Sequence, residues 1–191
     1  VKLFAASGPN WTSSSLYHGS PGRFDAFART IKINEVLTHT DAETDWIELF
    51  NSGVAAADLS GLRLTDHYGF PTRFTIPPGT ILAAGGYTNY SLSELGFGFS
   101  ELGGLAALLQ TSDTNVLRFL DTVDYPAMPR EETMGLFAKS DGTSDFTELR
   151  AKSKNLANAL PRIGPLVISE IHYAPATGMA SFVEIANITT S

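Results

Sequence analysis

The feature of this sequence that most constrains its fold is a segment that occurs twice. The first copy covers residues 31–51, IKINEVLTHTDAETDWIELFN, and the second covers residues 167–187, VISEIHYAPATGMASFVEIAN. Glu35 and Glu48 of the first copy recur in the second copy at a spacing of about 135 residues, and self-similarity of this kind indicates repeated structural units. A chain of 191 residues therefore has room for one complete unit and parts of two others.

This spacing divides the chain into three predicted parts. We expect residues 1–27 to be the C-terminal end of a preceding repeat or domain, because LFAAS at 3–7 resembles LFAKS at 136–140. Residues 28–160 are predicted to form the complete unit, and residues 161–191 the first two strands of a following repeat. The chain is accordingly expected to be a piece of a longer array.

The apolar pattern inside the complete unit is short throughout. Runs rich in Ile, Val, Leu and aromatic residues alternate with turn sequences, such as PPG at 77–79 and TSDTN at 111–115. No stretch keeps a helical apolar period over three turns. The pattern predicts an all-β sandwich of about eight or nine short strands. Residues 88–104 are rich in glycine and suit either one helical turn or a loop.

Composition excludes several classes of function. Hydrophobic residues make up 43% and charged residues 17%, which is typical of a globular chain. The formal net charge of −7 argues against a nucleic-acid partner, and the absence of cysteine excludes disulfides and thiolate metal sites. No apolar run reaches the roughly 18 residues needed to cross a bilayer.

Glu35 and Glu48 lie inside apolar strands and allow two interpretations. A pair of carboxylates can perform acid–base catalysis in a cleft. Alternatively, buried carboxylates accept hydrogen bonds from the backbone or pair with Lys32, Arg63 or Arg118 and so fix the strand register. We expect the second role. The histidines lack metal-binding spacing and the serines lack a nucleophile motif, so we do not expect an enzyme.

Two further groups are candidates for binding. Asp41, Glu43 and Asp45 follow one another at every second position in a loop, as calcium ligands can, although the glycine and the spacing of a known calcium loop are missing. Solvated loop carboxylates are the alternative, and no other cofactor is expected. Tyr68 and Tyr90 lie near glycines and are candidates for a surface that binds sugar or peptide.

Several segments, in this order, resemble the lamin tail domain in its bacterial, exported form: INEVL from Ile33, DWIELFN from Asp45, DLSGLRLTD from Asp58, FTIPPGTILAAGGY from Phe74, VLRFLD from Val116 and GLFA from Gly135. The resemblance covers residues 29–158. It implies an immunoglobulin-like β-sandwich, often found in tandem in long secreted or cell-surface bacterial proteins. One departure is Leu62, where the family often has tryptophan, which implies a smaller core contact here.

The resemblance leads to two functional hypotheses. The first is a non-catalytic structural or adhesive module of a secreted or cell-surface bacterial protein. Its partners would be neighbouring repeats or other copies of the protein, associating head-to-tail through the strands that carry Ile168, Ile171, Phe182 and Ile185. The alternative is an accessory domain of an exported hydrolase that binds polysaccharide or nucleic acid.

Overall fold

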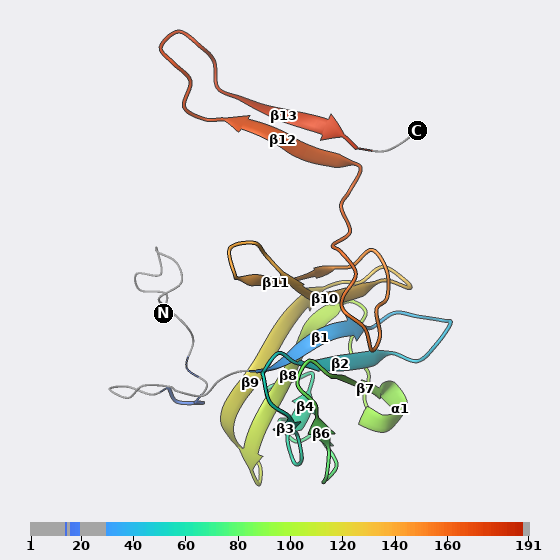
Figure 1. The fold of residues 1–191 in the computed structure, drawn as a ribbon. Helices are drawn as coiled ribbons and strands as arrows, with labels where there is room; N and C mark the ends of the chain where they lie inside the picture. Colours follow the sequence, from blue (N-terminus) through green and yellow to red (C-terminus); the bar gives the residue numbers. More distant parts are fainter. Residues whose placement is uncertain (1–13, 15, 20–29, 189–191) are drawn as a thin grey trace.

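The computed structural model describes residues 14, 16–19 and 30–188, and its described part contains thirteen strands and one short helix (Figure 1). The predicted first part, residues 1–27, lies outside the described residues except at 14 and 16–19. The elements are β1 (Ile31–Leu37), β2 (Trp46–Asn51), β3 (Ala57–Asp58), β4 (Arg63–Thr65), β5 (Phe74–Thr75), β6 (Ile81–Leu82), β7 (Tyr87–Ser91), α1 (Leu92–Leu95), β8 (Gly103–Ser112), β9 (Asn115–Pro126), β10 (Thr133–Ala138), β11 (Ser144–Glu148), β12 (Leu166–His172) and β13 (Phe182–Asn187).

The first sheet has the order β11-β10-β1-β2-β7, and each pair of neighbours is antiparallel. Its central strands β1 and β2 are rich in isoleucine, valine, leucine and aromatic residues, which favour extended backbone. Their register shifts between Ile33 and Glu35, so that Asn34 forms a bulge. This bulge places Glu35 directly opposite Glu48.

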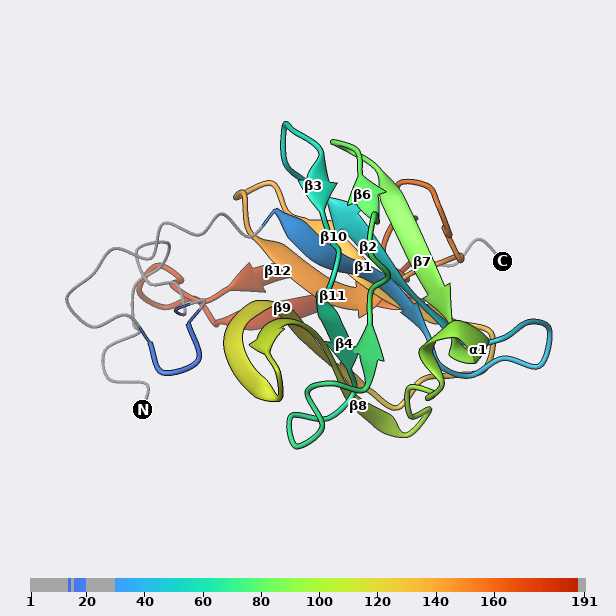
Figure 2. The same ribbon diagram turned by 90° about the horizontal axis from the view of Figure 1, so that it is seen from below.

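The second sheet has the order β5-β4-β8-β9, and β3 and β6 form a separate small pair. The hairpin of β8 and β9 is long and has two register shifts, which curve it over the first sheet (Figures 1 and 2). Its turn contains Asp113 with φ 52°, a left-handed conformation that aspartate tolerates better than most residues.

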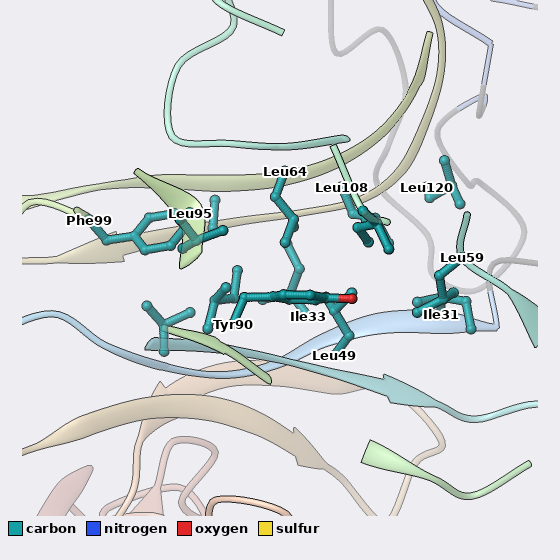
Figure 3. Packing of buried hydrophobic residues seen from close by; sticks show 14 of the residues in the cluster. Ile31, Ile33, Leu49, Leu59, Leu64, Tyr90, Leu95, Phe99, Leu108 and Leu120 are labelled. Carbon is teal, nitrogen blue, oxygen red and sulfur yellow. The ribbon is translucent and has the colours of Figure 1, made fainter. Parts of the chain in front are cut away.

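The hydrophobic core lies between the two sheets (Figure 3). Ile33 and Leu49 project from the first sheet, Leu64 and Leu108 project from the second, and all four side chains are fully buried. Each such side chain contributes roughly 1.5–3 kcal/mol relative to an exposed one. The core therefore holds the two sheets together as a sandwich.

The predicted all-β sandwich is confirmed, with differences in detail. Eleven strands lie between residues 31 and 148, which is more than the predicted eight or nine. Several of them have only two or three residues. Residues 88–104 contain most of β7, the helical turn α1 and the start of β8. The turn ends at Gly96, whose φ of 72° is left-handed and suits glycine.

The last two strands form a hairpin outside the sandwich. Within the described residues, β12 pairs with β13 and neither strand joins another sheet. Figure 1 shows this hairpin, in red, projecting away from the sandwich beyond the segment that follows β11.

Candidate functional site: a covered glutamate pair, an exposed hairpin and an aromatic pocket

Glu35 and Glu48 form a pair of buried carboxylates on the outer face of the first sheet. They lie directly opposite each other on β1 and β2, and both are fully buried. Ile47 and Leu49, which flank Glu48, belong to the core cluster, so Glu48 points away from the core. Two like charges in this position destabilise a sheet unless other groups satisfy them.

Residues 153–158, here called the cover segment, satisfy both carboxylates. Ser153 donates its backbone N–H, at 3.1 Å, and its hydroxyl, at 2.7 Å, to Glu35. The backbone N–H of Asn155 donates to one oxygen of Glu48, and the Asn34 side chain donates to the other at 2.8 Å. In Figure 1 the cover segment belongs to the orange chain that runs down over β1 and β2.

Asn158 fixes the far end of the cover segment. Its side-chain N–H₂ donates to the backbone oxygens of Asn34, at 3.0 Å, and Leu136, at 2.8 Å, and its oxygen accepts from the Asn34 side chain at 2.7 Å. This close approach needs Gly135, because a Cβ there would lie 2.5 Å from Leu149 and 2.9 Å from Asn158. The bulge, the glycine and the cover segment therefore form one network of buried polar groups.

The burial and the hydrogen bonds of the pair support a structural role. Burial raises the pKa of Glu48, while the N–H of Asn155 and the Asn34 side chain oppose that rise. The two glutamates lie on directly paired positions, but their carboxylates are buried beneath the cover segment rather than in an open cleft. Their hydrogen bonds from the backbone agree with the second interpretation above. Lys32 was one of the basic residues expected to pair with these carboxylates. It pairs instead with Asp121, at 3.7 Å.

The three acidic residues of the 41–45 loop do not meet at one point. Asp41 pairs with Arg130, and Glu43 pairs with Lys152 at 2.9 Å. Asp45 is half-buried, and burial raises the pKa of its carboxyl. Within residues 30–188, no group of three or more His, Cys, Asp or Glu side chains is placed to hold a metal ion.

Glu131 was not predicted and organises this loop. Its carboxylate accepts hydrogen bonds from Thr40, at 2.8 Å, from the backbone N–H of Asp41, at 2.8 Å, and from Lys152, at 2.6 Å. These donors lower the pKa of Glu131 to about 2, with Lys152 the largest cause. Only the fold reveals Glu131, because Thr40 and Asp41 are about 90 positions away in the chain.

The two candidate surface tyrosines have different environments. The prediction for Tyr90 is wrong, because its side chain is 7% exposed and its ring lies in the core, 5.2 Å from the ring of Phe74. The second sheet covers the inward-facing positions of β7. The glycine-rich sequence nearby does not indicate that Tyr90 faces inward. Tyr68 is 50% exposed and lines a pocket of about 600 Å³ beside β8 and β9.

The hairpin of β12 and β13 repeats the geometry of β1 and β2. Glu170 lies opposite Glu184, and the register shifts between Ile168 and Glu170, as it does between the matching residues of β1. Ser169 at the bulge donates to Glu184 at 2.6 Å, in the way that Asn34 donates to Glu48. The hairpin thus reproduces the glutamate pair, but both glutamates are exposed and no segment of the described residues covers them.

The predicted interface residues lie on this hairpin and are exposed. The exposed fractions are 62% for Ile168, 58% for Ile171, 47% for Phe182 and 63% for Ile185. Side chains at the matching positions of β1 and β2 are buried. The hairpin therefore exposes apolar surface of the kind that the sandwich covers.

The two packed antiparallel sheets define a β-sandwich. The family model of the Lamin Tail Domain matches residues 26–127, a little over half of the chain, and the chain belongs to this family. The match ends before β10 and β11, which nevertheless complete the first sheet. No curated protein and no solved structure matches the chain significantly. Among the residues described, no helix is long and apolar enough to span a membrane.

Proposed function

We propose that this chain is a non-catalytic structural module of a tandem lamin-tail protein. Residues 28–160 form one unit, and residues 161–191, which contain the hairpin of β12 and β13, begin the next unit. The hairpin packs with the remaining strands of a lamin-tail sandwich, supplied by a neighbouring repeat or by another copy of the protein. Association through successive hairpins then runs head-to-tail.

The observation that carries this proposal is the matching geometry of the two strand pairs. Ile33 pairs with Leu49 and Ile168 with Ile185, on the same side of the same bulge. A one-residue slip would reverse the faces of a strand, so a shared register and a shared bulge preserve the same division into inner and outer side chains. The hairpin therefore has the shape that a sandwich of this family takes up at its centre.

The surroundings of β1 and β2 show which contacts the hairpin does not make within the part of the chain that the structure describes. In the complete unit, β10 pairs with β1, β7 pairs with β2, and the second sheet covers the inner face. The cover segment satisfies Glu35 and Glu48 on the outer face. A partner that fits the hairpin would bring two flanking strands, an apolar sheet and N–H or O–H donors for Glu170 and Glu184. Such a partner is the rest of a lamin-tail unit, because a two-stranded hairpin alone has marginal stability.

The proposed setting is a secreted or cell-surface bacterial protein. What supports it is the resemblance of the sequence segments to the exported bacterial form of the family. Repeated units that each bind the next would build a fibre, which is the structural role proposed.

A designed extension tests the proposal. Residues 1–187 are followed by a second copy of residues 52–160, which supplies the strands missing from the hairpin. Hydrogen–deuterium exchange is compared between this extended chain and residues 1–191. We expect the amides of β12 and β13 to exchange quickly in the dilute chain and to be protected in the extended chain.

The control is the same extended chain with Leu64→Asp in the added copy alone, which breaks the core of the second unit. This control should leave the hairpin amides unprotected. Equal exchange in the extended chain and its control would refute the proposal. So would a dilute monomer whose hairpin is already protected by folding back on its own sandwich, which light scattering after size exclusion would identify.

Polysaccharide binding is the second candidate function, in an accessory domain of an exported hydrolase. One observation favours it, the aromatic pocket that Tyr68 lines. The net charge of −7 gives no comparable support to nucleic acid.

A further inference from the structure

The strongest unassigned site is the pocket on the outer face of the second sheet. It has a volume of about 600 Å³, within the range of roughly 300–1,000 Å³ that is typical of small-molecule sites. Leu109 and Phe119, which pair across β8 and β9, line it, and Leu109 is fully buried without belonging to the central core cluster. The pocket is therefore separate from the core and from the glutamate pair.

Three aromatic rings stand together in this pocket. The ring of Phe119 lies 6.0 Å from that of Tyr17 and 5.8 Å from that of Tyr68, and the Tyr68 ring is nearly perpendicular to it. Tyr17 is held in place by its backbone N–H, which donates to the oxygen of Leu117 on β9 at 3.2 Å. Both tyrosines are about half exposed, so each keeps surface that a ligand can contact.

Polar but uncharged groups complete the lining. They belong to the lining residues Ser14, Thr114, Thr122 and Asn115, whose side chains carry hydroxyl or amide groups. Among the described residues that line the pocket, none carries a formal charge. Burial raises the pKa of the Tyr68 phenol, and the negative charge of Asp124 adds to that rise, so the surroundings disfavour a further negative charge.

We propose that this pocket binds a neutral sugar, as a short oligosaccharide or a segment of a neutral polysaccharide. A sugar ring has a face of C–H groups that packs on an aromatic ring, and hydroxyls around its edge that bond to neutral donors and acceptors. The pocket supplies aromatic faces and neutral hydrogen-bonding groups together. A nucleic acid, a phosphate or an acidic polymer would need positive charge that these lining residues do not provide.

This inference deepens the second candidate function and is independent of hairpin association. Tyr68 and Tyr17 lie at the pocket, whereas the hairpin carries its own exposed apolar residues. Sugar binding and assembly can therefore fail separately.

Affinity electrophoresis of the whole chain in gels that contain xylan, starch or a mixed-linkage β-glucan tests the proposal, with alginate as an anionic comparison. We expect at least one neutral polymer to retard the chain. Tyr68→Ala and Tyr17→Ala should each weaken binding about tenfold, because each removes a ring that packs against the sugar. Tyr173→Ala is the matched control, since Tyr173 is 84% exposed outside the pocket, and it should bind like the unaltered chain.

Thermal unfolding of each variant establishes that it is folded before binding is compared. Failure of all three neutral polymers to retard the chain would overturn the proposal. Stronger retardation by alginate, or unchanged binding in both folded pocket variants, would overturn it as well.

Discussion

Ser153 donates its backbone N–H and its hydroxyl to the carboxylate of Glu35, although 118 positions separate the two residues. Glu35 lies on β1, the first strand of the unit, and Ser153 follows β11, its last strand. The contact therefore joins the beginning of the unit to its end. Leu149 and Pro161 flank the cover segment and pair with each other in one antiparallel bridge, which also holds the end of the unit in place.

Replacing Ser153 with alanine should destabilise the sandwich. The variant loses the hydroxyl that bonds to Glu35 at 2.7 Å and leaves a buried carboxylate with fewer donors. We expect the free energy of unfolding to fall by about 1–3 kcal/mol in urea titrations. Ser140→Ala, at an exposed position in the turn after β10, is the control and should change it by less than about 0.5 kcal/mol. Equal effects of the two substitutions would contradict a special role for Ser153.

A methyl group at Gly135 should interfere with the same network. The new Cβ would lie 2.5 Å from Leu149 and 3.1 Å from the backbone oxygen of Asn34, so the cover segment or the sheet must shift. Gly135→Ala should therefore reduce the free energy of unfolding by about 1–3 kcal/mol. Gly164→Ala is the matched control, because no atom lies within 4 Å of its new Cβ. Thermal melts in which Gly135→Ala is as stable as Gly164→Ala would show that the packing there is loose.

Leu49 and Ile185 occupy equivalent positions in the two strand pairs but should respond differently to truncation. Leu49 is fully buried, whereas Ile185 is 63% exposed. Leu49→Ala should cost about 2–5 kcal/mol of unfolding free energy. Ile185→Ala should cost less than about 0.5 kcal/mol in the dilute chain. A large effect of Ile185→Ala in a dilute monomer would mean that the hairpin is already covered by its own sandwich.

Glu131 should make the stability of the fold depend on pH in the acidic range. Its pKa falls from the ordinary 4.5 to about 2 on folding, so between these values the unfolded chain binds more protons than the folded chain. The contribution of Glu131 is present above pH 4.5 and is lost as the pH falls through about 2. In urea titrations, the difference in the free energy of unfolding between the unaltered chain and Glu131→Gln should shrink as the pH falls through this window. A difference that does not vary with pH would rule out the charged form of Glu131 as its source.

The fold was predictable from sequence because its strongest signals are local. Short apolar runs between turn residues indicated strands, and the repeat of Glu35 and Glu48 marked the strand pair at the centre of the first sheet. β7 was missed because Tyr87–Ser91 has no aliphatic residue and pairs with β2 at the sheet edge. Tyrosine and threonine favour strands, but the glycines that surround this segment favoured a loop in the sequence.

The candidate sites were less predictable because they depend on contacts between distant segments. A bonding role for Glu35 and Glu48 followed from the cost of burying a carboxylate, but their donors Ser153 and Asn155 had no distinctive spacing. The exposure of Tyr90 was predicted from nearby glycines and is wrong, because the second sheet covers that face. Which face of a strand is covered is a property of the whole sandwich.

The position of the cover segment has a mechanical consequence. It lies in the chain between β11 and β12, and its hydrogen bonds to β1 and β2 join it to the centre of the first sheet. Tension applied along the chain through β12 therefore reaches these bonds before it reaches β11. A pull between neighbouring units would load several short hydrogen bonds together, at strands in the middle of a sheet rather than at its edge.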